Sequence, residues 1–127
     1  MPRTTIVFFR EVDGTAPVMD WLEHLRRTNP RAFAKCVVRL ERLAELGHEL
    51  RRPEADTLRD GIHELRARLG HVNYRLLYSF HGRVVAVLLN ALTKEEAVPD
   101  RDIDLAVARK RAFEKDPEAH TFVPTQL

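Results

Sequence analysis

The chain has 127 residues, of which 44% are hydrophobic and 31% are charged, a composition that is ordinary for one globular domain. The formal net charge of +2 favours an acidic partner only weakly, and the single cysteine, Cys36, leaves neither an internal disulfide nor a cysteine framework for zinc. No apolar run approaches the roughly 18 residues that span a bilayer, and the N-terminal residues lack a signal-peptide core, so we expect a cytoplasmic protein without a membrane segment.

A strand and a short helix are predicted in the first 28 residues. Residues 4–9 are β-branched and aromatic and precede the turn signal Asp13-Gly14, which is typical of a strand. Apolar side chains then recur at positions i, i+3, i+4 and i+7, starting at Val18. This spacing predicts an amphipathic helix over residues 17–28, with Thr15 as its N-cap.

A second helix is predicted over residues 30–46. Asn29 suits an N-cap, Pro30 suits the first helical position, and an apolar stripe continues as far as Gly47. Because almost no loop separates the two helices, they should form a hairpin whose apolar faces pack on one side of a sheet. We expect four of their side chains in the core: Trp21, Leu22, Val37 and Leu40.

Three strands follow a polar segment, residues 48–60, that reads as a loop. Strand-like runs over residues 62–69, 72–80 and 84–89 are separated by Gly70-His71 and His81-Gly82, the pattern of an antiparallel meander. The third run is apolar throughout and should be a central strand buried on both faces.

A final helix should begin at Pro99 and keep its apolar spacing to Phe113, whereas residues 117–127 lack periodicity and should form a flexible tail. The predicted fold class is therefore α+β, in the order β-α-α-β-β-β-α. Its four-stranded, mostly antiparallel sheet would carry the helical hairpin on one side and would be completed by the C-terminal helix within a single domain over residues 1–116.

Arginines gather in the predicted meander. The five are Arg59, Arg66, Arg68, Arg75 and Arg83, against only Asp60 and Glu64 over the same residues. Strand alternation places Glu64, Arg66 and Arg68 on one face, and a hairpin turning at Gly70-His71 brings Arg66 close to Arg75. Adjacent guanidiniums repel unless an anion lies between them, and a phosphodiester is such an anion. The alternative interpretation is that these arginines only solvate an exposed sheet face.

Several motifs occur in the order found in one toxin family. They are Phe9 to Gly14, Pro17 to Leu22, Gly61-Ile62-His63-Glu64-Leu65-Arg66, Tyr74-Arg75-Leu76-Leu77-Tyr78, Leu88 to Glu95 and Val98-Pro99. Over roughly residues 6–113 they resemble the phage-derived Gp49-like branch of the RelE/HigB toxin superfamily. The resemblance implies a RelE-like fold and a toxin of a type II toxin–antitoxin system. Such a toxin cleaves mRNA, usually in the ribosomal A site, and is held inactive by a cognate helix-turn-helix antitoxin.

The resemblance also implies the basic residues of the site. The family's Glu-Leu-Arg arginine corresponds to Arg66, its Tyr-Arg-x-x-Tyr arginine to Arg75, and the basic residue after its last strand to Lys94. The chain departs from the family at two positions. Members of this branch often carry two lysines where this chain has Lys94-Glu95, and other members have a basic side chain at the position of Glu64.

A mechanism without metal or cofactor is consistent with these residues. The ribose 2′-OH would attack the adjacent phosphate and leave a 2′,3′-cyclic phosphate and a 5′-hydroxyl. Arg66 and Arg75 would stabilise the phosphorane, and Lys94 would neutralise or protonate the leaving oxygen. Glu64, or alternatively Glu54, would accept the 2′-OH proton. Four further residues are predicted to bind RNA: Arg59, Arg68, Arg83 and, unless it is a core side chain, Tyr78.

Two functions of different classes fit this sequence. One is the ribosome-dependent endoribonuclease, for which the set of Arg66, Arg75 and Lys94 is the discriminator. The other is a non-enzymatic protein on the same fold, either a ParE-like gyrase inhibitor or a domesticated RNA-binding module. His63 and His71 are either acid–base groups or ordinary surface histidines.

Overall fold

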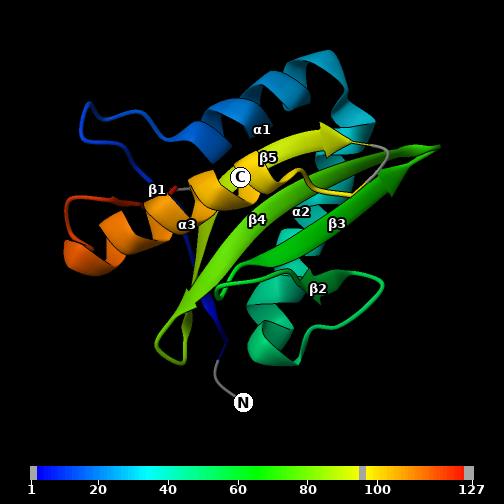
Figure 1. The fold of residues 1–127 in the computed structure, drawn as a ribbon. Helices are drawn as coiled ribbons and strands as arrows, with labels where there is room; N and C mark the ends of the chain where they lie inside the picture. Colours follow the sequence, from blue (N-terminus) through cyan, green and yellow to red (C-terminus); the bar gives the residue numbers. More distant parts are fainter. Residues whose placement is uncertain (1–2, 95–96, 125–127) are drawn as a thin grey trace.

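The computed structural model describes residues 3–94 and 97–124, although for Lys94 it describes the backbone alone. A six-stranded mixed sheet carries helices on both faces (Figure 1). The elements in chain order are β1 (Thr5–Phe9), α1 (Pro17–Thr28), α2 (Pro30–Leu46), the 3-10 turn η1 (Gly47–Glu49), β2 (Ala55–Thr57), β3 (His63–Leu69), β4 (Val72–His81), β5 (Val85–Lys94), α3 (Asp100–Lys115) and β6 (Thr121–Phe122). None of the helices in the described ranges combines the length and apolar character that a bilayer span requires.

The α+β class is confirmed, but the predicted four-stranded sheet is wrong. The strands lie in the order β2-β3-β4-β5-β1-β6. The four predicted strands are present as β1, β3, β4 and β5, and β1 runs parallel to β5. The predicted loop at residues 48–60 contributes β2, which pairs with β3, and β6 pairs with β1. These two short strands cover backbone groups that a four-stranded sheet would leave unpaired at its edges.

Both helices of the hairpin have the predicted limits. The side chain of Asn29 accepts a hydrogen bond from the Ala32 backbone N–H at 3.2 Å, as expected of an N-cap. Thr15 does not cap α1, because its hydroxyl donates to Asp13 at 2.7 Å and Ala16 occupies the N-cap position. In the core, Leu22 and Leu40 are buried, whereas Trp21 and Val37 are only partly buried.

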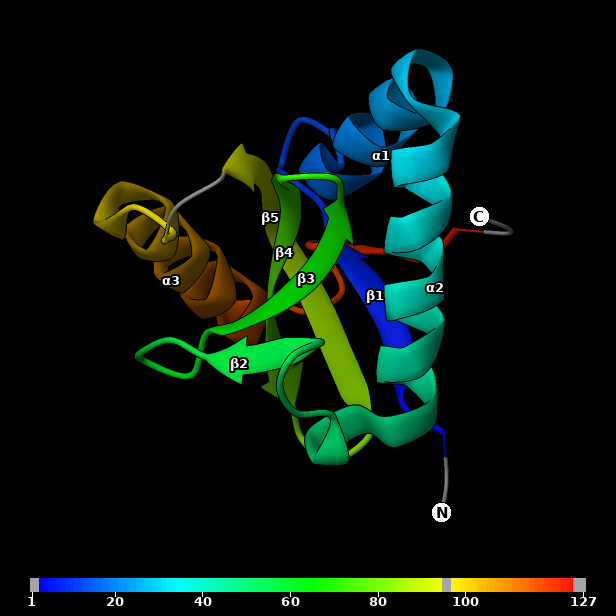
Figure 2. The same ribbon diagram turned by 90° about the vertical axis from the view of Figure 1, so that its right-hand side faces the viewer.

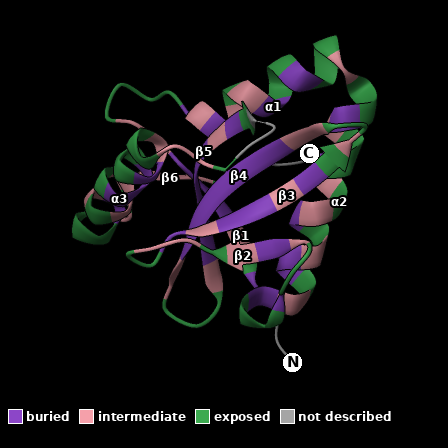
Figure 3. Ribbon diagram, turned by 45° about the vertical axis from the view of Figure 1, so that its right-hand side comes forward, coloured by how far each residue is buried: buried purple, intermediate pink, exposed green. Residues whose placement is uncertain are grey.

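The sheet separates two apolar cores (Figures 2 and 3). The hairpin of α1 and α2 covers one face and α3 covers the other. The central strand β5 is buried on both faces as predicted, since Ala86 to Leu89 are fully inaccessible. Cys36 lies in the core beneath the hairpin, and burial raises the pKa of its thiol to about 12.

Part of the segment predicted as a flexible C-terminal tail contacts β1. The ring of His120 stacks on Phe9 with centroids 5.0 Å apart, and its Nδ1 lies 2.7 Å from the carbonyl oxygen of Arg10. The Arg10 side chain in turn donates to the carbonyl oxygen of Ala119 at 3.2 Å. These contacts dock β6 against β1, so the folded unit extends past residue 116. Residues 125–127 lie outside the described part of the chain.

Candidate nucleic-acid interface

Arg66 and Arg75 lie directly opposite one another on β3 and β4, as the two-residue turn at Gly70-His71 predicts. On the neighbouring strands, the partner of Glu64 is Leu77 and the partner of Arg75 is Leu92. Leu77 and Leu92 belong to the core beneath α3. Paired residues in a sheet share a face, so Glu64, Arg66 and Arg75 all face the α3 side.

The anion between the two guanidiniums is the carboxylate of Glu64. Arg66 Nε donates to Glu64 Oε1 at 3.1 Å, and Arg75 Nη1 donates to the same oxygen. Glu64 is only 2% exposed and Arg75 only 7%, whereas the Arg66 side chain retains 30% of its surface. Glu64 therefore holds the two arginines together in the free protein.

Asp56 on β2 extends this ion-pair network. Its Oδ2 lies 3.0 Å from Arg66 Nη2 and 2.8 Å from Arg52 Nη2. The hydrogen bond from Arg52 lowers the pKa of the Asp56 carboxyl, although burial opposes that shift. Three guanidiniums against two carboxylates leave the network with one positive charge. Asp56 and Arg52 are not predicted from the sequence, because the segment that carries them reads as a loop.

One donor in the network has no partner. The buried Nε of Arg75 has no hydrogen-bond acceptor within the described ranges. A buried donor without an acceptor costs about 1–3 kcal/mol, so Arg75 is held in an arrangement that does not satisfy its guanidinium.

The helix α3 stops short of this cluster. It is fixed to β5 by Arg109 Nη1, which donates to the Leu89 carbonyl oxygen at 2.9 Å, and by the Asn90 amide, which donates to the Asp102 carbonyl oxygen at 2.7 Å. Beyond those contacts, Arg66 is partly exposed and Arg68 is exposed, with its Nε bonded to the Gly70 carbonyl oxygen at 2.9 Å. The turn end of β3 and β4 is thus the open, cationic part of this face.

Lys94 is the third residue of the expected basic set. Its backbone pairs with Asn73 at the end of β5, two residues from the partner of Arg75. The Lys94 side chain and Glu95 lie outside what the structure describes.

Two of the predicted RNA-binding arginines lie away from the cluster. Arg59 is paired with Asp104 of α3 at 2.7 Å and with Asp60 at 2.9 Å, and the hydrogen bond that it donates to Asp104 raises the pKa of its guanidinium. Arg83 lies in the turn after His81, the last residue of β4. At about 3.3 Å a residue, that turn is about 20 Å or more from Arg75 along the strand. Neither arginine extends the surface formed by Arg66, Arg68 and Arg75.

Tyr78, predicted either to stack on or orient a base or to be a core side chain, lies in the core. Tyr78 is 1% exposed and belongs to the core beneath the hairpin of α1 and α2, on the opposite face from Arg75. Burial raises its pKa to about 12. The reason is strand alternation, since Tyr74, Leu76 and Tyr78 share the hairpin face.

Metal ligation has no geometric support in the residues that the structure describes, because no group of three or more His, Cys, Asp or Glu side chains converges there. His63 turns to the hairpin face, where it stacks on Tyr78 at 5.3 Å. It therefore cannot serve as an acid or base beside Arg75.

Comparison with known proteins places these features in a family. No curated protein gave a significant match to the chain. The family model described as phage-derived protein Gp49-like (DUF891) matches residues 20–111, well over half of the chain. The matched region runs from α1 into α3 and includes Glu64, Arg66 and Arg75. The chain therefore belongs to the phage-derived Gp49-like family (DUF891), a family of RelE/HigB-like toxins.

Proposed function

We propose that this protein is the toxin of a type II toxin–antitoxin pair and acts as a ribosome-dependent mRNA endoribonuclease. The observation that carries the proposal is the pair of guanidiniums on the α3 face, where the partly exposed Arg66 lies opposite the buried Arg75. Each guanidinium presents a fork of N–H donors, and such forks match the non-bridging oxygens of a phosphodiester. Family membership supplies the toxin class.

In the proposed reaction, the 2′-OH attacks the adjacent phosphorus while the 5′-oxygen leaves, giving a 2′,3′-cyclic phosphate and a 5′-hydroxyl. The charge that builds on the phosphorane oxygens would be stabilised by Arg66 and Arg75. Lys94, at the adjoining end of β5, would neutralise or protonate the leaving oxygen. Arg68 would contact the RNA backbone from the same open face.

The burial and double pairing of Glu64 favour a positioning role over that of a general base. Its carboxylate is bonded to both catalytic guanidiniums and is nearly inaccessible. We expect Glu64→Gln to lower the cleavage rate while leaving the shape of its pH profile unchanged, because a glutamine oxygen can still accept from one arginine. A general base would instead show its titration in the acidic limb of that profile, and loss of this limb in Glu64→Gln would contradict the positioning role.

A small helix-turn-helix antitoxin is the proposed partner, and the cationic open face is the surface that an acidic antitoxin segment would cover. Translating ribosomes are the proposed site of action, which places the toxin in the cytoplasm. Co-purification of the chain with the product of the neighbouring gene tests the partnership. Recovery of the chain alone at high yield, without growth arrest, would count against a toxin.

The activity is tested by expressing the chain without its partner and mapping mRNA ends by primer extension on translating ribosomes. New 5′ ends at A-site codons are expected, together with growth arrest. Growth arrest with intact mRNA would exclude the nuclease and favour the gyrase-inhibitor alternative, for which supercoiling of plasmid DNA is the direct readout.

A further inference from the structure

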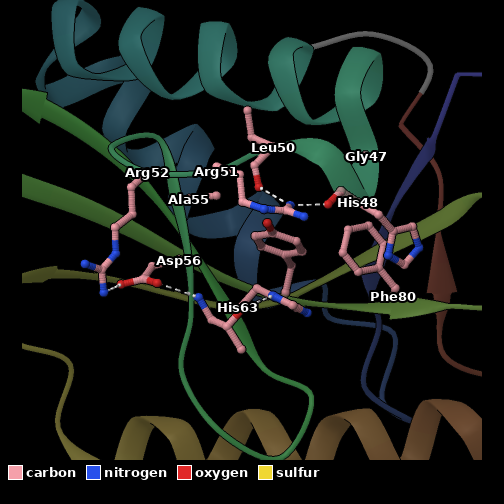
Figure 4. A pocket seen from close by; sticks show the side chains of 11 residues that line it. Gly47, His48, Leu50, Arg51, Arg52, Ala55, Asp56, His63 and Phe80 are labelled. Atoms are coloured by element: carbon pink, nitrogen blue, oxygen red, sulfur yellow. Dashed lines mark hydrogen bonds and ion pairs between the residues drawn. The ribbon is translucent and has the colours of Figure 1, made fainter.

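A polar cavity lies against the hairpin face of the sheet, where Tyr78 and His63 line it. It has a volume of about 500 Å³ and is lined by η1, the segment that leads into β2, and the inner faces of β3 and β4 (Figure 4). Cavities of about 300–1,000 Å³ are usual for small-molecule sites. The lining residues used below are His48, Arg51, Asp56, His63, Tyr78 and Phe80.

Aromatic rings form one wall of this cavity. His48 stacks on Phe80 with centroids 3.6 Å apart and planes 22° apart, and His63 stacks on Tyr78 at 5.3 Å and 24°. Exposure increases from the buried Tyr78, through the half-buried His63 and Phe80, to the exposed His48. A wall of flat rings that runs from the core to solvent suits a planar heterocycle, which it can hold by stacking.

The positively charged side chain of Arg51 also lines the cavity. The Arg51 guanidinium lies between the Arg52–Asp56 ion pair on one side and the rings of His48 and Phe80 on the other (Figure 4). Its Nη1 donates to the carbonyl oxygens of His48 and Leu50, the latter at 3.2 Å. Within residues 3–94 and 97–124, no carboxylate lies within ion-pairing distance of Arg51. Neutral carbonyls thus orient the guanidinium without cancelling its charge, which leaves it free for an anion.

The cavity is lined by two arginines, Arg51 and Arg52, and one carboxylate, Asp56. Burial lowers the pKa of His63, and the nearby His48 and Arg51 lower it further. The Nδ1 of His63 lies 3.2 Å from the Thr57 hydroxyl, so one edge of the aromatic wall also carries groups that can donate and accept hydrogen bonds. A ligand that combines a planar polar ring with a phosphate would use the rings, this edge and the free guanidinium together.

We propose that this cavity binds a nucleotide, with its base against the rings of His48 and His63 and its phosphate on Arg51. The same chemistry can come from a free mononucleotide or from one nucleotide of single-stranded RNA. The proposal does not require the nuclease function, because the wall of rings lies on the hairpin face of the sheet. Asp56 touches both sites, since it lines the cavity and pairs with Arg66 of the cluster.

Calorimetric titration of the full chain tests the proposal. The probes are adenosine 5′-monophosphate, uridine 5′-monophosphate, a single-stranded RNA hexamer and inorganic phosphate. We expect at least one nucleotide-containing probe to bind at least about tenfold more tightly than inorganic phosphate, since stacking adds to the phosphate contact. Binding of mononucleotides identifies a free nucleotide as ligand. Binding of the hexamer alone identifies RNA.

Two variants with exposed side chains locate the binding. Arg51→Ala should weaken the Kd on the order of ten- to a hundredfold through loss of a charge-assisted contact, and His48→Ala should weaken it on the order of five- to a hundredfold through loss of stacking. Arg27→Ala, which removes an exposed arginine of α1, is the matched control and should not change the Kd. Equal affinity for nucleotides and phosphate, binding unaffected in both variants, or no binding of any probe would overturn the proposal. A thermal melt of each variant confirms that it is folded.

Discussion

At the scale of single residues, Arg75 is the side chain on which the proposed chemistry most depends. Removing one preorganised donor to a transition state commonly costs a factor on the order of 100 to 1,000, so we expect Arg75→Ala to lower the cleavage rate by that factor. Arg83→Ala is the comparison, because the exposed Arg83 lies about 20 Å or more from Arg75 along the strand and its loss should leave the cleavage rate unchanged. Primer extension on ribosomes measures the rate, and a binding assay measures the affinity.

Because Arg75 is also buried against Glu64, its loss could act through folding instead. Leaving the buried Glu64 carboxylate without this partner should cost about 3–5 kcal/mol of stability, read from a denaturant melt. The double variant Arg75→Ala with Glu64→Gln removes the buried carboxylate charge that has lost this partner, and it should regain part of that stability without regaining cleavage. Recovery of cleavage in the double variant would show that Arg75 is structural and not catalytic.

His63 offers a test of the cavity through its titration. Burial, His48 and Arg51 hold its pKa below the ordinary value of 6.5, so an NMR titration should find that lower pKa and Arg51→Ala should raise it. Since the unfolded chain binds the proton more readily, stability should fall as the pH drops through about 6.5 toward the folded pKa. His63→Gln should flatten this dependence, and an unchanged profile in that variant would assign it to other groups.

At the scale of elements, β6 shows how a two-residue strand can contribute to stability. His120→Ala removes its ring stack on Phe9 and its hydrogen bond to the Arg10 carbonyl. We expect a loss of about 1–2 kcal/mol in the free energy of unfolding, measured with urea. His24→Ala, at an exposed position of α1, is the control and should lie within about 0.5 kcal/mol of wild type. Equal stability of both variants would mean that β6 does not dock in solution.

At the scale of the whole molecule, Cys36 reports on the integrity of the core. Its thiol is fully buried beneath the helical hairpin, and burial raises its pKa to about 12. Since the thiolate is the reactive form, labelling by a disulfide reagent at neutral pH should require opening of the fold and should accelerate through the unfolding transition. Rapid stoichiometric labelling of the native protein would show that α2 separates readily from the sheet.

Several features of this protein follow from the sequence alone, because they depend on neighbouring residues. The 3.6-residue spacing and the Asn29-Pro30 start signal determine α1 and α2. Alternation and the turn at Gly70-His71 determine the register that places Arg66 opposite Arg75. The same alternation places Tyr78 in the core. The basic face was therefore predictable as a pattern, although its counter-ion was not.

The tertiary structure alone decides the features that join distant segments. The strands β2 and β6 are too short to show a periodicity, and they form because β3 and β1 offer unpaired edges. Arg59 is neutralised by Asp104, 45 residues away along the chain. Glu64 stands as an acid in a basic segment, and its burial between two guanidiniums depends on how β3, β4 and α3 pack together. Burial and ion pairing arise from the packing of segments far apart in the chain, so local sequence patterns do not specify them.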